Sequence, residues 1–420
     1  MGPEPAGPAS STVPDESSWR YAGWRAVAAC FVMALFCWGF GLYGHGVYLA
    51  ELQRIHGWPA SLISAASTMT YLVSGVLGIF TSDAIARLGP KRFVLLGIAA
   101  MGTATSLIAV VTQPWQLYAA YVLMAAGWMG LGITTISTIL SLWFRERGGL
   151  AISLALNGAS CGGIIVAPAL VFLTAAIGFT AAMLATSAVM MLVLVPIVAF
   201  WIDRPPDRTG MIALASSASP RVAAPAVLRR PDVLRSFAFW TISAPFALAL
   251  VAQIGFLVHQ ISFLAPIVGR AQAGFAVIVT TAMAVVGRLT LGALVDRLDP
   301  RAATAGSLVS QAAALAALIW TRDSTVLLLA CAVYGFSVGN IITLPPLIIR
   351  REFAPAAFGV VMGLSSAVGT FIGAFGPAIV GFARDVSGGY GAALALCVVL
   401  KLAAAGVVML RRGRAIAPKL

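Results

Sequence analysis

Arg288 is the most unusual charged residue of the sequence, because it lies inside a long apolar stretch, eight residues before Asp296. On a helix this separation corresponds to about 12 Å. An arginine at that depth in a bilayer costs at least a few kcal/mol unless it meets water, a partner or an anion. Its planar guanidinium can bind a carboxylate through two parallel hydrogen bonds. Arg288 therefore predicts an anionic ligand; the alternative is a structural arginine satisfied by helix carbonyls.

Other polar side chains within apolar stretches are candidates to accompany this ligand. His45 follows a glycine-rich segment and could exchange a proton near neutral pH, although a packed, hydrogen-bonded histidine is the commoner case. His259 is a weaker candidate of the same kind. Lys401 is expected to snorkel toward an interface rather than to bind substrate. Amides and phenols could orient a ligand, but they equally hold membrane helices together. These further candidates are Tyr43, Tyr71, Tyr121, Asn157, Gln253 and Asn340.

The chemistry that is missing excludes several classes of protein. The 14 acidic residues all fall in tails, connections or span ends, and the three histidines and five cysteines have no metal-ligand spacing. The sequence has no HExxH or Walker motif, and no GxSxG in the strand-to-helix context of a nucleophile. We therefore expect no enzyme active site, no metal, no cofactor and no direct use of ATP.

The elements that must position these residues are membrane helices. The chain has 420 residues, 60% of them hydrophobic and 10% charged, with a mean hydropathy of +0.96. Since about 20 apolar residues span a bilayer, this length accommodates about twelve spans. We expect them at residues 26–50, 60–82, 93–112, 115–141, 149–175, 178–201, 236–265, 273–295, 303–320, 325–348, 356–382 and 390–410.

The distribution of positive charge predicts the orientation. With these spans, 21 of the 27 Lys and Arg residues lie on the side that holds both termini, and four lie on the opposite side. Positive charge accumulates on the cytoplasmic side of membrane proteins, so both termini are expected in the cytoplasm. The same bias accounts for the net charge of +13 without a nucleic-acid partner. The four residues on the opposite side are Arg54, Arg270, Arg322 and Arg384.

The sequence also divides into two similar halves. Asp83 in GIFTSDAIARLGPKR corresponds to Asp296 in GALVDRLDPR, 213 residues later, and the longest connection is rich in Pro, Ser and Ala. The predicted fold is an all-α membrane protein with twelve transmembrane helices in two pseudo-symmetric six-helix bundles. We expect a cytoplasmic tail (1–18), an N-terminal bundle (19–202), a linker (203–234), a C-terminal bundle (235–411) and a second tail (412–420).

These segments resemble the major facilitator superfamily of transporters over about residues 24–411. The connection after the second span of each half matches the signature of that superfamily, with one extra residue between Gly78 and Asp83 in the first copy. Within the superfamily, the monocarboxylate porter and oxalate/formate antiporter branch is similar in four segments. They are YGHGVYLAELQRIHGW (43–58), WFRERGGLAISLALNGASCGG (143–163), GRLTLGALVDR (287–297) and GAFGPAIVGFARDVSGGY (373–390).

The resemblance implies roles for individual residues. Arg288 is similar to an arginine that recognises the substrate carboxylate in this branch. Proton-coupled porters of this branch carry an acid four residues before this arginine, where this chain has Ala284. The oxalate type carries a lysine in span 11, but residues 356–382 contain none. A substrate with one carboxylate is therefore favoured over a dianion. The residues expected to latch and release the cytoplasmic gate are Asp83, Arg87, Arg92, Asp296 and Arg297.

The expected function is secondary transport of a small organic monocarboxylate by alternating access, through proton symport or anion exchange. Two alternatives stay open: efflux of neutral or drug-like solutes, and a dicarboxylate/formate-type antiporter. The expected setting is a bacterial inner membrane, with the protein as a multi-pass monomer. The expected partners are the substrate anion, the lipid bilayer, and protons or a counter-anion.

Overall fold

The twelve predicted spans are present as helices in the computed structural model of the chain. The structure describes residues 16, 18, 21–144, 146–202, 230–294, 298–354 and 357–410. Within these ranges all regular structure is helical, and twelve helical segments are long and apolar enough to cross a membrane. The predicted all-α fold is confirmed.

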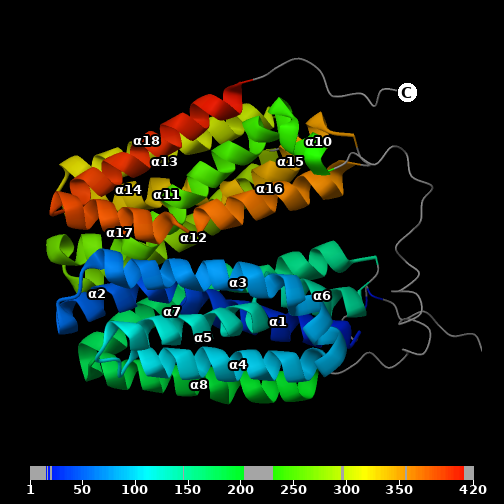
Figure 1. Cartoon of the computed structure of the whole chain (residues 1–420), viewed down its shortest axis with the longest axis horizontal. Helices are drawn as coiled ribbons and strands as arrows, with labels where there is room; N and C mark the ends of the chain where they lie inside the picture. Colours follow the sequence, from blue (N-terminus) through cyan, green and yellow to red (C-terminus); the bar gives the residue numbers. More distant parts are fainter. Residues whose placement is uncertain are drawn as a thin grey trace, which may run out of the picture.

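The helices form two bundles, one for each half of the sequence (Figure 1). The first half contains α1 (Gly23–Trp38), η1 (Gly39–Tyr43), α2 (Gly44–His56), α3 (Ala60–Leu88), α4 (Pro90–Ile108), α5 (Pro114–Leu131), α6 (Ile133–Trp143), α7 (Gly148–Ile177) and α8 (Phe179–Trp201). The second contains α10 (Arg230–Arg235), α11 (Phe237–Val268), α12 (Arg270–Leu294), α13 (Pro300–Trp320), α14 (Ser324–Val338), α15 (Asn340–Glu352), α16 (Phe358–Gly373), α17 (Gly376–Ser387) and α18 (Tyr390–Met409).

Residues that disfavour helix continuation mark the helix ends. Gly57 ends α2 and Gly178 ends α7, both with positive φ (66° and 84°), which glycine adopts without steric cost. Pro90 and Pro300 begin α4 and α13, where a proline loses no helical hydrogen bond. The boundaries therefore follow from local sequence.

Four of the twelve spans are interrupted. The first span contains a π-helical turn, η1, between α1 and α2. The fourth span breaks at Gly132, which is extended between α5 and α6. The tenth span breaks before Asn340, and the eleventh breaks after Gly373. Such interruptions are frequent at functional positions in membrane helices.

The two halves pack against one another mainly along the helix pairs α7 with α12, α2 with α11 and α3 with α17. Glycines allow the backbones to approach. A Cβ atom on Gly163 would overlap the Thr281 methyl group, and one on Gly381 would overlap the hydroxyl of Ser64. Small residues at helix crossings are the usual means of close packing in membranes.

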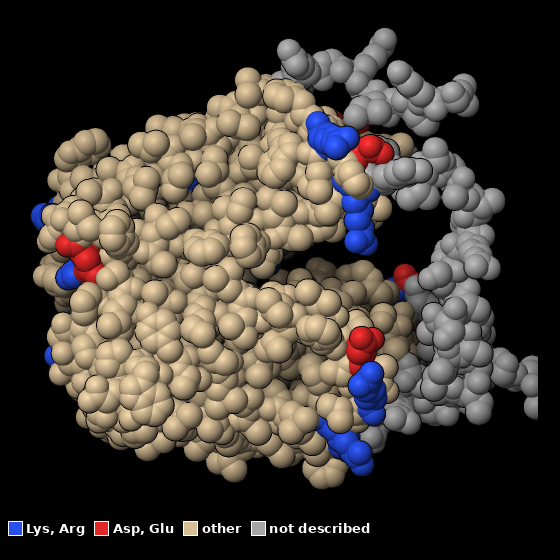
Figure 2. Space-filling view, viewed as in Figure 1, with Lys and Arg blue, Asp and Glu red and all other residues tan. Residues whose placement is uncertain are grey.

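The contacts between the halves close one end of the molecule and leave the other open. We call the end at which α1 begins and α18 ends the terminal end, and the opposite one the far end. Figure 2 shows a cleft between the halves that opens at the terminal end. At the far end, polar contacts join α3 to α17 and α2 to α12. The structure is therefore open toward the terminal end.

Candidate functional site

Arg288 and Tyr43 are brought together across the two halves. Arg288 is half-buried on α12, and its Nε is buried without a hydrogen-bond partner in the described part of the chain. Tyr43 ends the π-helical turn of the first half and packs against the hydrophobic cores of both halves. The two residues lie close enough for the guanidinium charge to act on the phenol. A guanidinium with an unpartnered Nε, beside a phenol, is suited to binding an anion.

The helix that carries Arg288 is held rigidly. A Cβ atom on Gly287 would overlap the carbonyl oxygen of Phe336, and one on Gly339 would overlap that of Ala284. The backbone of α12 is therefore in direct contact with the tenth span immediately beside Arg288. Such support limits the positions that the guanidinium can adopt.

His45, Tyr71 and Tyr121 form a second group, inside the first half. The Tyr71 hydroxyl donates to the carbonyl oxygen of Gly41 in η1 (3.0 Å) and lies 3.5 Å from Nδ1 of His45. His45 Nε2 lies 3.2 Å from the sulfur of Met124, and the Tyr121 ring lies 5.1 Å from the imidazole. His45 is fully buried, so a proton must reach it through a conformational change. Its role in proton exchange stays a prediction.

The amide candidates are dispersed. Gln253 and Asn340 are buried, and each has a side-chain oxygen without a partner among the described residues. The Asn340 amide donates to Ser307 (3.3 Å). Asn157 is exposed on α7. No hydrogen bond of the described chain joins these amides to Arg288. His259 has a structural environment, 3.0 Å from the Tyr390 hydroxyl and 3.1 Å from the Pro377 carbonyl.

The gating candidates of the first half are exposed in this conformation. Asp83 and Arg87 lie in the last turns of α3, which continues to Leu88, and Arg92 follows in α4. None of the ion pairs in the described part of the chain includes Asp83. Asp296 and Arg297 lie outside the described residues.

The prediction that Lys401 snorkels to an interface is wrong. Its side chain is fully buried, and its ammonium donates to the carbonyl oxygen of Ala249 (2.9 Å) and lies 5.9 Å from the centre of the Tyr334 ring. The reason is packing, because α18 lies against both α11 and α13. The Lys401 ammonium therefore reaches a backbone carbonyl of α11 more readily than the membrane interface.

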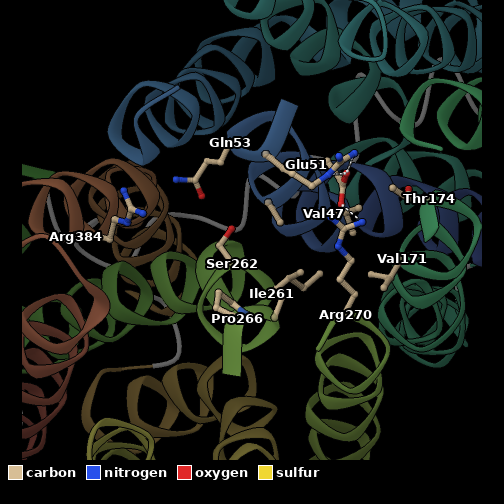
Figure 3. Close-up of a pocket in the computed structure, with 13 residues that line it drawn as sticks. Val47, Glu51, Gln53, Val171, Thr174, Ile261, Ser262, Pro266, Arg270 and Arg384 are labelled. Atoms are coloured by element: carbon tan, nitrogen blue, oxygen red, sulfur yellow. Dashed lines mark hydrogen bonds and ion pairs between the residues drawn. The ribbon is translucent and has the colours of Figure 1, made fainter. Parts of the chain in front are cut away.

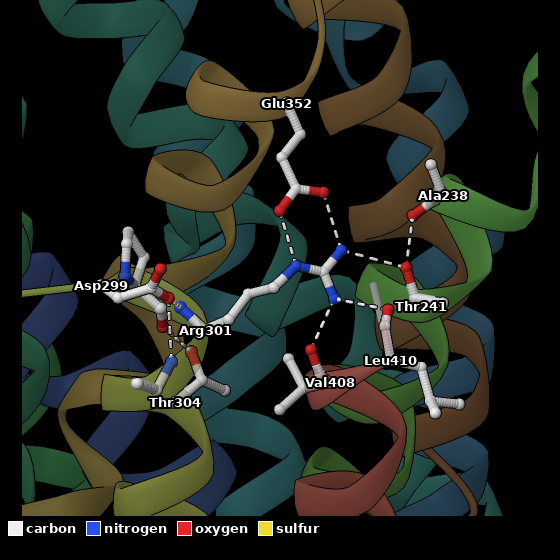
Figure 4. Close-up of polar contacts among 10 residues, drawn as sticks. Ala238, Thr241, Asp299, Arg301, Thr304, Glu352, Val408 and Leu410 are labelled. Atoms are coloured by element: carbon white, nitrogen blue, oxygen red, sulfur yellow. Dashed lines mark hydrogen bonds and ion pairs between the residues drawn. The ribbon is translucent and has the colours of Figure 1, made fainter. Parts of the chain in front are cut away.

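Arg301 forms a buried network at the terminal end that the sequence analysis missed (Figure 4). Its Nε and Nη2 donate to the two carboxylate oxygens of Glu352 (2.6 and 2.7 Å), and Nη2 also donates to Thr241 (3.0 Å). Its Nη1 donates to the carbonyl oxygen of Val408 (2.5 Å). The network ties α13, α15, α11 and α18 together. The sequence contained one signal for Arg301, which is the last residue of the segment GALVDRLDPR.

A second missed feature is the closure of the far end. The Asp385 carboxylate accepts hydrogen bonds from the backbone amides of Ser61 (2.7 Å) and Ala60 (3.3 Å), the first two residues of α3. Glu51 bonds Arg54 of its own helix (2.8 Å) and Arg270 of the other half (3.4 Å). Glu51 was expected at the end of its span, but α2 continues to His56 and buries it.

A pocket of about 430 Å³ lies beside this closure, and we call it the far-end pocket (Figure 3). Helices of both halves line it. Its charged residues are Glu51, Arg54, Arg270 and Arg384. A cleft at one end and a charged pocket at the other, around a central arginine, are typical of a secondary transporter.

Sequence comparison gives the family. The profile of the Major Facilitator Superfamily matches residues 29–377, and the chain belongs to that superfamily. Mouse monocarboxylate transporter 11 is 26% identical over 431 residues, which cover 94% of this chain and 87% of that protein. Rat monocarboxylate transporter 13 is 25% identical, with 95% and 90% covered. A putative anionic 4-hydroxy-benzoate permease of Thauera aromatica is 37% identical over 106 residues, 24% of this chain and 63% of that protein.

Solved structures share the fold at low identity. The nucleoside transporter NupG superposes with a TM-score of 0.71 at 14% identity, covering 93% of this chain and all of that one. A bacterial homolog of the human lysosomal transporter Spinster, inward-facing and occupied, gives a TM-score of 0.68 at 13% identity, with 93% and 95% covered. These likenesses establish the fold alone.

Proposed function

We propose that the protein transports a small organic monocarboxylate by alternating access, with Arg288 binding the carboxylate. The observation that carries the proposal is the buried, unpartnered Nε of Arg288, beside Tyr43 and between the halves. Arg288 has no acidic partner among the described residues, and a single guanidinium favours a ligand that supplies one negative charge.

The relatives support this substrate class. Two of them are named monocarboxylate transporters, and a third is named as a permease for an aromatic carboxylate anion. The first two align with nearly the whole chain. A monocarboxylate substrate agrees both with these names and with the single charge of Arg288.

The conformation supports an assignment of sides. We take the terminal end as cytoplasmic, because 21 of the 27 Lys and Arg residues fall in the tails and in the connections expected on the side of the termini. Both termini are then cytoplasmic, and the structure is inward-open. In this state Asp83 has no ion pair among the described residues, as a released cytoplasmic latch requires. In the outward-open state we expect Asp83 to pair with Arg87 or Arg92, and Asp296 with Arg297 in the second half.

The remaining residues have supporting roles in the proposal. His45 accepts and releases the proton if transport is proton symport, and has no such role if it is anion exchange. The protein works as a monomer in a bacterial inner membrane, with residues 19–202 and 235–411 as its two moving bundles. The groups that orient the substrate are Tyr43, Tyr71, Tyr121, Asn157, Gln253 and Asn340.

Ligand-induced thermal stabilisation of the detergent-purified protein tests this function. A ligand that binds the folded state raises its apparent stability. We expect short monocarboxylates to stabilise the wild type and Arg322→Gln, which removes an exposed arginine at the far end, clearly more than Arg288→Gln. Stabilisation by neutral or cationic compounds that is equal in all three proteins would instead support efflux. Preferential stabilisation by dicarboxylates would support the dicarboxylate/formate-type antiporter.

A further inference from the structure

We propose that the far-end pocket is a second anion site, where a substrate carboxylate displaces Glu51 from Arg270 and so weakens the closure of the far end. The inference rests on the proposed function, since it assigns the same class of ligand to a second place on the pathway. The pocket encloses about 430 Å³, enough for a small organic anion, and both halves line it (Figure 3).

The pocket carries an excess of positive charge. Three arginines line it, and Glu51 is the acid among its lining residues. The nearby Asp385 accepts from Arg384 (2.7 Å), but it also accepts from the backbone amides of Ser61 and Ala60. The guanidinium groups are therefore incompletely neutralised, which concentrates anions in such a cleft.

Two buried polar atoms of the lining residues have no partner in the described part of the chain. They are Nε of Arg384 and Oγ1 of Thr174. An unsatisfied donor and hydroxyl are costly when buried. Arg384 and Thr174 lie on opposite sides of the pocket (Figure 3), so a ligand carboxylate can accept from one of them, and the pocket offers a hydrogen bond as well as charge.

The geometry of Glu51 allows an exchange of partners. One of its carboxylate oxygens bonds Arg54 twice, at 2.9 Å from Nε and 2.8 Å from Nη2, within the same helix. Its other oxygen is 3.4 Å from Arg270 of the opposite half. A ligand carboxylate can therefore take Arg270 while Glu51 keeps Arg54. The exchange removes an ion pair that joins the halves, so the ligand favours opening of the far end.

Protection of a cysteine in the pocket from alkylation tests this site directly. The protein is the full chain with three substitutions. Arg288→Gln removes the central site, and Gln53→Cys introduces the reporter. Cys161→Ser removes the native cysteine that could react, because the other four are buried. The probe is benzoate, with benzamide as its neutral isostere, and the reagent is N-ethylmaleimide. We expect benzoate but not benzamide to slow the labelling.

Two further substitutions separate an anion site from a simple latch. Glu51→Gln frees Arg270 and should lower the benzoate concentration for half protection about fivefold, near the upper range for a partly exposed ion pair. Arg270→Gln should abolish most of the protection. If the Glu51–Arg270 ion pair only holds the two halves together, Glu51→Gln and Arg270→Gln both open the far end and change the labelling rate in the same direction.

The outcomes are distinguishable from those of the proposed function. Opposite effects of Glu51→Gln and Arg270→Gln support the site, whether or not Arg288 binds substrate. Effects in the same direction, equal protection by benzamide, or no protection by benzoate overturn it. Arg384→Gln gives a second test if Arg270→Gln does not fold, because it leaves Glu51 untouched and should also weaken protection. Unchanged ligand stabilisation in Arg288→Gln refutes the central site alone.

Discussion

The carboxylate of Asp385, near the end of α17, lies 2.7 Å from the backbone nitrogen of Ser61, at the start of α3. A side chain of the second half thereby caps a helix of the first. Free amides at a helix start bind a carboxylate well, because the helix dipole adds to the hydrogen bonds. In the proposed alternating-access cycle this contact must break when the far end opens, so its strength should contribute to the equilibrium between the two conformations.

Asp385→Asn should shift this equilibrium toward the state that is open at the far end. The asparagine amide keeps one acceptor oxygen but loses the negative charge. This should weaken the closed state by about 1 kcal/mol, which is roughly fivefold in the equilibrium constant between the closed and open far end. The measurement is alkylation of Val47→Cys by an impermeant maleimide from the far side. Val47 lines the far-end pocket and is buried in this conformation, so labelling should accelerate.

Asp323→Asn is the matched control for this prediction. Asp323 caps its own helix, α14, by accepting from the amides of Thr325 (2.9 Å) and Val326 (3.0 Å). Because asparagine is as good an N-cap as aspartate, Asp323→Asn should change stability by less than about 0.5 kcal/mol and should not change the labelling of Val47→Cys. Equal acceleration by both substitutions would show that the Asp385 contact has no special part in closure.

Gly381→Ala should also disfavour closure of the far end, for a steric reason. The added Cβ would overlap the hydroxyl of Ser64 and lie 3.0 Å from the carbonyl oxygen of Ala60. Overpacking of this kind costs about 1–3 kcal/mol, and here it acts on one conformation. Reconstituted protein should show a several-fold slower initial uptake. Gly363→Ala, with no atom within 4 Å of its Cβ, should retain the normal rate, and an equal loss there would refute the argument.

Arg301→Met should destabilise the second half strongly. Arg301 is 2% exposed, and its removal leaves the Glu352 carboxylate and the carbonyl of Val408 without their donors. Breaking a buried ion pair from one side costs about 3 kcal/mol. Thermal unfolding in detergent should show the loss. Arg351→Met removes an exposed side chain that donates to the carbonyl oxygen of Leu298 (3.2 Å), and should change stability by less than about 0.5 kcal/mol.

Lys401→Met should be tolerated or stabilising. The ammonium has a carbonyl and an aromatic ring as neighbours, and it forms no ion pair among the described residues. A methionine of similar volume removes the cost of burying a charge. We expect an increase of up to about 1–2 kcal/mol in unfolding free energy and unchanged uptake. A large loss of uptake in a stable variant would assign Lys401 a transport role.

Much of the fold was predictable because membrane helices depend on local composition. Residues 149–175 were expected as one span and form α7, Gly148–Ile177. The interruption of the first span was not predictable, since the carbonyl of Gly41 in the π-turn is held by Tyr71 of another helix. Burial of Lys401 likewise depends on which helices flank α18.

The site was predictable in part. Arg288 could be identified from one sequence, because an arginine in an apolar stretch is rare and costly. The contact of Asp385 with Ser61 joins residues 324 positions apart, and the pairing of the halves is not encoded in any local pattern. The role of Glu51 was hidden because α2 runs past its expected end. The roles of His45, Gln253 and Asn340 stay predictions.

Uptake of a radiolabelled monocarboxylate into proteoliposomes tests the central claim most directly. The proteins are the wild type, Arg288→Gln, Arg288→Lys and the charge-matched control Arg322→Gln. Loss of a bidentate, charged contact should lower uptake by Arg288→Gln about a hundredfold, and Arg288→Lys, which keeps the charge without the fork, should lose less. Arg322→Gln should match the wild type. Wild-type rate and KM in folded Arg288→Gln protein would contradict the account.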